Sequence, residues 1–281
     1  MSEHLSVACV QLTPDADRAA GIAAAVAAVR QAAAEGVELV ALPEYVVQLH
    51  SSGRVMREGA GPEEGDEALA AFSAAAREGG CWVLVGSLTQ RTADGRVANR
   101  SFLIDDSGSV VARYDKLHMF EATMPNGRVI RESKVYEPGS HAVVADTPWG
   151  GLGMSICYDV RFPQLYRALA QHGAGIITVP SAFTQSTGEL HWHALLRARA
   201  IENGCFIVAP ATCGVHPESH ATFGHSLVVD PFGAVVLDGG VEPGVYSVDL
   251  HLSQLGAARS KIPSLEHDRP FTVEVPSRLM S

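Results

Sequence analysis

The stretches EGVELVALPEY, residues 35–45, and HGAGIITVPSA, residues 172–182, decide the fold class of this chain. In each of them a glycine that can end a helix is followed by an apolar run that stops at a proline. Continuous apolar runs are typical of strands whose two faces are both covered. A second pair, GGCWVLVG at 79–86 and NGCFIVAP at 203–210, repeats this order. The sequence therefore predicts an α/β protein whose two halves share one structural plan.

Helices and strands alternate outward from these stretches. The expected elements are helices at 17–35, 63–78, 163–172 and 189–203, and hairpins at 101–115 and 226–238. Helices between strands imply crossover connections, so two such halves predict two mixed sheets packed face to face with helices outside. Residues 256–281 continue beyond the pattern, and we expect this tail to pack on the domain or on a partner subunit.

The composition is that of a globular protein and limits the partners. The chain has 281 residues, a net charge of -10, 47% hydrophobic and 19% charged residues, and no basic run longer than a pair. Nucleic-acid binding depends on clustered Lys and Arg and is not expected. The start, MSEHLSVACVQL, has no basic region before an apolar run, and the Ala-rich stretch 21–29 is shorter than the roughly 20 residues of a membrane span. We expect a cytoplasmic protein that does not bind a membrane.

The cysteines do not suggest a disulfide framework. There are five of them, an odd number, and no Cys-x-x-Cys pair occurs; they are Cys9, Cys81, Cys157, Cys205 and Cys213. Three begin or lie inside apolar, strand-like runs, where a thiol behaves as a small hydrophobic group. Disulfides are rare in the expected compartment.

Three charged residues stand where a site could form. Glu44 follows an apolar strand, and reactive groups gather at the carboxyl ends of strands in α/β sheets, although a solvated loop glutamate has the same local pattern. Lys116, in RYDKLHMF, is either a fixed positive charge among apolar neighbours or a lysine that reaches solvent. Glu132 lies in a long polar connection between the halves and alone reads as an exposed glutamate.

Cys157 lies between an expected strand and an expected helix, after Gly151 and Gly153. A sharp strand-to-helix turn can present a nucleophile, as in a nucleophile elbow, although the G-x-S-x-G pattern is absent. A helix start at this turn is expected to lower the thiol pKa and to offer N–H groups to an anion. A buried structural cysteine is the alternative.

No metal or cofactor is expected. His191 and His193 are two residues apart on a helix and face different sides, whereas His216 and His220 have helical spacing but lie in a proline-containing loop. There is no P-loop, and no G-x-G-x-x-G fingerprint follows the first strand.

Together these motifs resemble a known superfamily. ALPEY around Glu44, YDKLHMF around Lys116 and SICYDVRFPQLYR around Cys157 are similar to the nitrilase superfamily of carbon–nitrogen hydrolases, over roughly residues 5–255. The blocks PSAFTQSTGELHWHALLRARAIENGCFIVAPA and GHSLVVDPFG resemble the branch that contains deaminated glutathione amidase and omega-amidase.

The resemblance implies a carbon–nitrogen hydrolase domain over 5–255 with a four-layer α-β-β-α sandwich, and homodimers or higher homo-oligomers. It implies that Glu44, Lys116 and Cys157 are catalytic and that Glu132 is a further family glutamate. The expected reaction is hydrolysis of a small amide to an acid and ammonia through a thioester on Cys157. Lys116 and the backbone N–H of Tyr158 would stabilise the oxyanion.

The substrate is defined less sharply by the resemblance. The branch implies a monoamide of a 2-oxo dicarboxylic acid or a substrate like deaminated glutathione. Arg161 is a candidate to bind the substrate carboxylate, although it could instead form a surface salt bridge. Arg197 and Arg199 could also be structural. Glu121 replaces an aspartate common in the branch, and Glu189–Leu190 replaces a Pro-Ala pair in a loop that borders the pocket of relatives. Nitrile or N-carbamoyl hydrolysis, and a non-catalytic binding module, stay open as alternatives.

Overall fold

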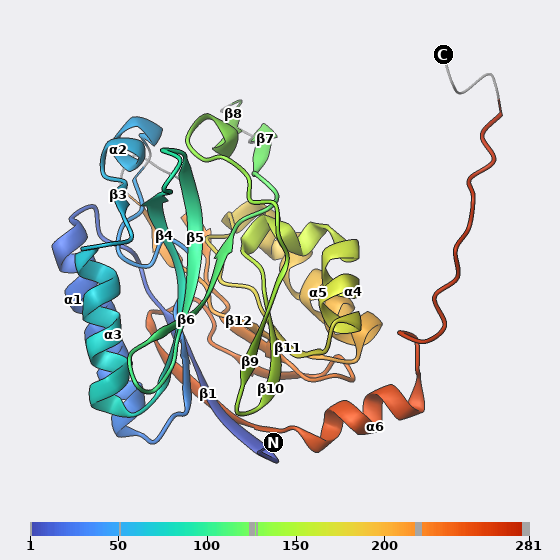
Figure 1. The fold of residues 1–281 in the computed structure, drawn as a ribbon. Helices are drawn as coiled ribbons and strands as arrows, with labels where there is room; N and C mark the ends of the chain where they lie inside the picture. The colour runs from blue at the N-terminus through green and yellow to red at the C-terminus, as the bar shows by residue number, and fades with distance from the viewer. Residues whose placement is uncertain (1, 51, 124–126, 128, 217–220, 277–281) are drawn as a thin grey trace.

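Two mixed sheets form the centre of the protein in the computed structural model, which describes residues 2–50, 52–123, 127, 129–216 and 221–276 (Figure 1). The first sheet has the spatial order β17 (Gly244–His251), β1 (His4–Gln11), β2 (Leu39–Ala41), β4 (Trp82–Arg91), β5 (Val97–Ile104) and β6 (Val110–Asp115), with the short β3 (Gly61–Pro62) beside β4. The second has the order β16 (Val235–Asp238), β15 (Leu227–Val229), β12 (Phe206–Ala209), β11 (Ala174–Thr178), β10 (Gly150–Met154) and β9 (Val143–Thr147).

The two sheets have the same topology. In the first, β1, β2 and β4 run parallel and the hairpin of β5 and β6 follows antiparallel. In the second, β10, β11 and β12 run parallel and β15 and β16 follow antiparallel. Each sheet gains one antiparallel strand beside its first strand, β17 next to β1 and β9 next to β10. The shared plan predicted from the paired sequence phrases is therefore present in the strand order.

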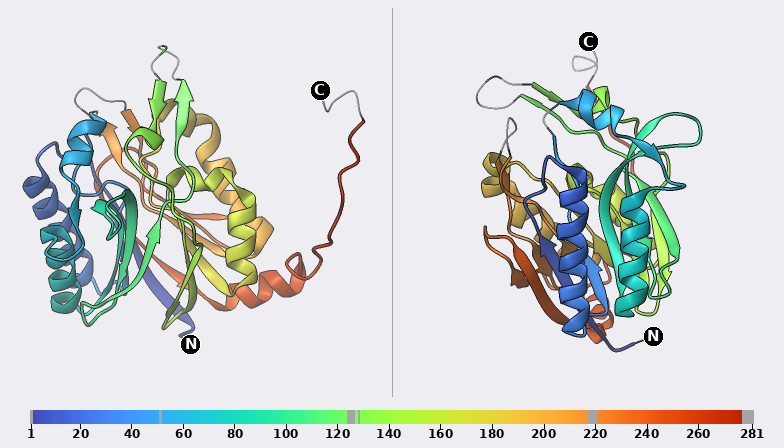
Figure 2. Two further views of the ribbon diagram at one scale, coloured as in Figure 1. Left: turned by 45° about the horizontal axis from the view of Figure 1, so that its top comes forward. Right: turned by 90° about the vertical axis from the view of Figure 1, so that its left-hand side faces the viewer.

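Helices cover the outer faces of both sheets. In Figure 2, α1 (Arg18–Ala34) and α3 (Glu67–Gly79) lie on one side of the sheet pair, and α4 (Pro163–Gln171) and α5 (Gln185–Asn203) lie on the other. One apolar cluster joins inward-facing residues of both sheets, among them Val7, Leu84 and Ile176. A second cluster packs the outer face of the first sheet against α1 and α3. The predicted four-layer α-β-β-α sandwich is confirmed.

Local sequence signals set several helix ends. The side chains of Asp17 and Asp66 accept hydrogen bonds from backbone N–H groups in the first turns of α1 and α3. Gly80 and Gly204 end α3 and α5 with φ angles of 60° and 54°, a conformation that glycine adopts without strain. The expected start of the fourth helix at residue 189 is wrong, because α5 already begins at Gln185.

The chain ends with a short helix and an extended segment. Helix α6 (Ser253–Lys261) is held by Arg259, which donates to the carbonyls of Ala174 and Gly204. Beyond α6 the chain runs away from the body of the molecule (Figure 1). Asp268 contacts α4 through Gln171 at 2.5 Å, and residues 266–276 are exposed. Within the described ranges, none of the helices combines the length and the apolar character that a membrane crossing needs.

Candidate active site

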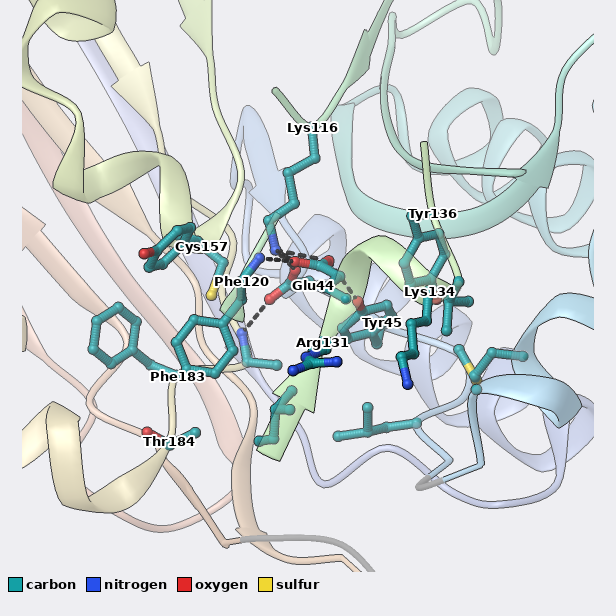
Figure 3. A pocket seen from close by; sticks show the side chains of 18 of the residues that line it. Glu44, Tyr45, Lys116, Phe120, Arg131, Lys134, Tyr136, Cys157, Phe183 and Thr184 are labelled. Atoms are coloured by element: carbon teal, nitrogen blue, oxygen red, sulfur yellow. Dashed lines mark hydrogen bonds and ion pairs between the residues drawn. The ribbon is translucent and has the colours of Figure 1, made fainter. Parts of the chain in front are cut away.

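Three segments that each follow a strand meet at one cavity of about 490 Å³. Glu44 comes three residues after β2, Lys116 directly follows β6, and Cys157 comes three residues after β10. The first two therefore come from one sheet and the third from the other. Figure 3 shows the Cys157 sulfur beside the cluster of Glu44 and Lys116. The structure brings together the residues that the sequence placed at strand ends.

Lys116 binds two buried carboxylates. Its Nζ lies 2.9 Å from Glu44 Oε1 and 2.9 Å from both carboxylate oxygens of Glu132. All three residues are buried, with exposed fractions of 2% for Lys116, 1% for Glu44 and 8% for Glu132. Burial alone lowers the pKa of Lys116, but Glu132 and Glu44 raise it well above its ordinary value in total. Lys116 is therefore a fixed positive charge and does not reach solvent.

Further hydrogen bonds hold the two carboxylates in place. Asn99, on β5, donates from Nδ2 to Glu44 Oε1 at 2.9 Å and to Glu132 Oε1 at 3.1 Å. The Tyr45 hydroxyl also donates to Glu132 Oε1, and the backbone N–H of Ala182 donates to Glu44 Oε2 at 2.7 Å. The sequence analysis missed Asn99 and Tyr45. A polar residue inside an apolar strand is the one signal that could have pointed to Asn99.

Glu132 also fixes the segment that carries Lys116. It is the first residue of the 3-10 helix η1 (Glu132–Lys134), and its Oε2 accepts the backbone N–H of Phe120 at 2.7 Å. Glu132 is thus a buried residue of the cluster and not an exposed glutamate. Glu121, by contrast, lies on β7 (Glu121–Thr123), where it accepts a hydrogen bond from Ser133, and it does not line the cavity.

Cys157 lies at a tight turn. It begins the 3-10 helix η2 (Cys157–Arg161), and its φ of 48° is in the left-handed region, which is rare for a residue with a side chain. The buried carboxylate of Asp159 secures this turn, because it accepts the N–H of Ile156 at 2.9 Å, the Tyr114 hydroxyl at 2.7 Å and the N–H of His118 at 3.0 Å. One residue thereby joins the cysteine turn to the strand that delivers Lys116.

The surroundings of Cys157 raise the pKa of its thiol. Burial and the neighbouring Glu44 carboxylate raise its pKa well above the ordinary value, and Lys116 lowers it only in part. The expectation that a helix start lowers this pKa is wrong, because the turn leads into a short 3-10 helix inside a buried site. A base is therefore needed to form the thiolate, and Glu44 is the carboxylate that interacts with the thiol.

The other four cysteines have no comparable setting. All five are buried and free. Burial raises the pKa of Cys9 and of Cys205 to about 12 in both cases. Of the five, only Cys157 lines the cavity.

The cavity holds a second hydrogen-bond donor besides the lysine. Tyr158 lines it, and the backbone N–H of Tyr158 has no protein acceptor in the part of the chain that the structure describes. This N–H and the Lys116 ammonium are both available to a negatively charged oxygen beside Cys157.

Three basic side chains line the outer part of the cavity. Arg161 lies over the rings of Tyr158 and Phe183, at 5.9 Å and 5.2 Å, and has no carboxylate partner among the described residues. Arg131 and Lys134 extend into the same cavity (Figure 3), and neither forms an ion pair within the described ranges. The sequence analysis missed these two, since exposed charges in a connection have no local signature.

Other candidate residues lie outside the cavity. Arg197 donates to the Gly233 carbonyl at 2.8 Å, and Arg199 donates to the Val160 carbonyl at 2.9 Å, so both are structural. Glu189 and Leu190 lie within α5 and do not line the cavity, which corrects their expected place in a bordering loop. His191 contacts Arg161, His216 contacts Thr222, and His220 lies outside the described residues.

A buried cysteine, a carboxylate and a lysine ammonium in one pocket of an α-β-β-α sandwich match the pattern of a cysteine hydrolase of the nitrilase superfamily. Residues 6–260 match the carbon–nitrogen hydrolase family, and the chain belongs to this family. A deaminated glutathione amidase from Yersinia enterocolitica is 40% identical over 245 residues, which cover 86% of this chain and 85% of that protein. The human protein of the same name is 38% identical over 277 residues, covering 94% and 82%.

Solved structures agree with this assignment. The C. elegans NitFhit protein superposes with a TM-score of 0.88 at 34% identity, covering 95% of this chain and 66% of that one. An amidase from Nesterenkonia sp. AN1 superposes with a TM-score of 0.79 at 26% identity, covering 95% and 94%. That amidase carries the acetamide moiety of fluoroacetamide on its active-site cysteine. The protein is a cysteine-dependent amidase that acts on carbon–nitrogen bonds.

Proposed function

We propose that the protein hydrolyses a small carboxylated amide to an acid and either ammonia or an amine, with Cys157 as the nucleophile. The observation that carries this proposal is one pocket lined by Cys157, Glu44 and Lys116, in which Glu44 binds the Lys116 ammonium at 2.9 Å and raises the pKa of the Cys157 thiol. This arrangement pairs a nucleophile with its base and places a cation where negative charge would develop.

The first half-reaction forms a thioester. Glu44 takes the proton of the Cys157 thiol, and the sulfur attacks the amide carbonyl carbon. The carbonyl oxygen becomes an oxyanion, which Lys116 and the Tyr158 N–H stabilise; one such donor contributes on the order of 3 kcal/mol. The proton on Glu44 then passes to the leaving nitrogen, the carbon–nitrogen bond breaks, and the nitrogen departs as ammonia from a primary amide or as an amine from a substituted amide.

The second half-reaction uses the same groups. Glu44, again ionised, removes a proton from a water molecule that attacks the thioester carbonyl. The carbon–sulfur bond breaks, the acid leaves, and the proton returns to the Cys157 sulfur. Glu132 acts as a positioning residue, because its carboxylate holds Lys116 and the Phe120 N–H at the same time.

The basic rim of the cavity supports a carboxylated substrate. Arg131, Lys134 and Arg161 face a pocket that also has apolar walls, including Phe120 and Phe183. A carboxylate bound there would form charge-assisted hydrogen bonds without displacing a protein carboxylate. The names of the relatives point to deaminated glutathione, a 2-oxo amide with carboxylates, and we propose this substrate class or a 2-oxo dicarboxylic monoamide for the chain.

Removal of the rim charges should weaken binding of the carboxylate and leave the chemistry intact. For Arg131→Met or Lys134→Met we expect kcat/KM for a carboxylated 2-oxo amide to fall about 10- to 100-fold, mainly through KM, because a hydrogen bond to a charged group contributes about 1.5–3 kcal/mol. Steady-state ammonia release measures this. Arg54→Met, an exposed arginine on α2 (Gly53–Glu58), is the matched control. If kcat/KM for a neutral amide of the same length falls equally, these basic residues do not recognise the carboxylate.

The experiment that tests the function is a search for an acyl adduct on Cys157. When turnover of a candidate amide or ester is quenched with acid, the unmodified protein should carry the acyl group on Cys157. The Glu44→Gln variant lacks the base of both half-reactions and should carry no added mass. Intact-mass and peptide mass spectrometry locate the added mass. Release of the acid product, with ammonia or the amine, by the unmodified protein from a panel of 2-oxo acid amides, nitriles and N-carbamoyl compounds then separates the activities. An adduct on another cysteine, or turnover without any Cys157 adduct, contradicts the assignment.

We further propose that the chain forms a homodimer through α4 and the C-terminal segment, in the cytoplasm. Asp268 already contacts α4 at Gln171. Phe271, Val273 and Val275 alternate with polar residues, and the first two are 85% and 75% exposed. Alternating apolar side chains on an extended segment can bind the surface of a second subunit. Five free, buried cysteines support a reducing compartment.

The dimer should depend on this apolar face. We expect the protein to elute as a dimer in size-exclusion chromatography with light scattering, and Phe271→Ser combined with Val273→Ser to raise the dissociation constant by about tenfold or more, since two large apolar side chains lose their burial. Thr272→Ser, on the opposite face of the same segment, is the control. A monomeric unmodified protein, or a dimer unaffected by the double change, rules out this interface.

A further inference from the structure

A second group of reactive side chains lies outside the catalytic cavity. His193 is on α5, His225 lies between β14 (Ala221–Phe223) and β15, and Asp238 ends β16. One nitrogen of each histidine and one carboxylate oxygen of Asp238 all lie within 4.8 Å of one another. None of the three residues lines the catalytic cavity, and the mechanism uses none of them.

The distances within this group match the needs of a small metal ion. His193 Nε2 lies 3.0 Å from Asp238 Oδ2, and His225 Nδ1 lies 2.8 Å from Asp238 Oδ1. Ligands bound at about 2.0–2.1 Å to a tetrahedral zinc ion stand about 3.3 Å from one another. The two histidine–carboxylate distances are a few tenths of an ångström shorter than this spacing, and one ligand atom of each residue lies within 4.8 Å of the others, so the three side chains can surround one ion after local rearrangement.

The surrounding structure holds the ligands in place. The Gly240 N–H donates to Asp238 Oδ1 at 2.9 Å, and the His225 N–H donates to the Gly240 carbonyl. The His225 ring stacks on Phe223 with centroids 4.4 Å apart. His225 has a φ of 53°, an unfavourable conformation for histidine that directs its ring to the group. Residues that second contacts orient in this way form ready ligand sets.

The donor set selects the kind of ion. Two imidazoles and one carboxylate suit zinc and similar divalent transition metals, whereas magnesium and calcium prefer sites built from oxygen alone. We propose that His193, His225 and Asp238 form a binding site for one zinc-like divalent transition-metal ion. The side chains are 38%, 24% and 34% exposed, which leaves a further coordination position open to water.

The proposed ion would join three separate segments. It links helix α5 to the connection before β15 and to the end of β16, all on the second half of the molecule. Trp192 connects this site to the catalytic cavity. Its indole donates to the His225 carbonyl at 2.8 Å, and its ring packs on Phe183, which lines the cavity. Bound metal should therefore stabilise the fold and leave the catalytic residues themselves unligated.

The test measures metal binding directly. Untagged Cys157→Ala protein, whose catalytic thiolate cannot compete for metal, is stripped with a chelator and titrated with Zn²⁺ by calorimetry, with bound metal counted by elemental analysis. We expect about one equivalent per chain and a raised thermal midpoint. His193→Asn and His225→Asn should each weaken binding by on the order of 100-fold or more. Asparagine tolerates the left-handed backbone at position 225. His141→Asn, an exposed histidine in another loop, is the control.

Each outcome decides the proposal. Stoichiometric binding that disappears in both ligand variants and survives in His141→Asn supports the site. Absence of binding, or binding that is equal in all variants, overturns it and leaves the three residues as a hydrogen-bonded network. Visible absorption of Co²⁺ added to the same proteins keeps the test decisive if a variant is unstable, because the spectrum of the unmodified ligand set reports histidine coordination by itself.

Discussion

Cys157→Ala is expected to abolish amide hydrolysis, with turnover reduced on the order of 10⁶-fold, because the variant has no nucleophile to form the thioester. The fold should survive, since only the sulfur is removed from a side chain at the edge of a cavity. Ammonia release measures the loss, and circular dichroism with a thermal midpoint measures the fold. Intact-mass spectrometry should find no acyl adduct.

A matched cysteine separates the chemistry from general effects of thiol loss. Cys81 is buried next to β4 in the cluster beneath α1 and α3, and it does not line the cavity. Cys81→Ala should lower the stability modestly, by about 1 kcal/mol, and leave kcat unchanged. Retained turnover in Cys157→Ala would falsify the assignment of the nucleophile.

Most of the fold could be predicted from the sequence, because both halves contain the same local pattern of helix, glycine and apolar strand. Residues 35–45 and 172–182 became β2 and β11 with their flanking turns, and the predicted hairpins became β5–β6 and β15–β16. The outer strands β9 and β17 were not predicted. Strand β17 pairs with β1, which is far away in sequence, and β9 pairs antiparallel with β10. The sequence of a short strand does not by itself indicate which strand it pairs with.

The contacts within the active site could not be predicted from the local sequence. Glu44 and Lys116 are separated by 72 residues, and their contact arises only when β2 and β6 join one sheet. Asn99 contributes to the cluster from the middle of β5, and nothing near it in sequence indicates a carboxylate partner. The strand-end positions could be predicted, but the hydrogen bonds among them depend on tertiary packing.

The direction of the Cys157 pKa shift was also predicted incorrectly from the local sequence. A helix start predicted a lowered pKa for Cys157, yet burial and Glu44 raise it. Tertiary burial and a neighbouring charge outweigh a local dipole, because desolvation of an anion is a larger effect than one turn of helix. The same two causes explain why a base must act in the mechanism.

Lys116→Met should cost both activity and stability. The variant loses the cation that binds the oxyanion, which reduces kcat by about 10²–10³-fold. It also leaves the buried carboxylates of Glu44 and Glu132 without a countercharge, and removal of one partner from a buried ion pair costs about 3–5 kcal/mol. Urea denaturation measures the free energy of unfolding, and ammonia release measures kcat.

The loss of activity and the loss of stability in Lys116→Met can be separated, because a second change can restore stability without restoring turnover. Glu132→Gln added to Lys116→Met removes one of the two unpaired charges, so it should recover part of the stability while turnover stays low. Lys134→Met, at an exposed lysine, should change the free energy of unfolding by no more than about 0.5 kcal/mol. If Lys116→Met instead unfolds at the same urea concentration as the unmodified protein, Lys116 does not neutralise the buried carboxylates, and its assigned role in holding the site together is wrong.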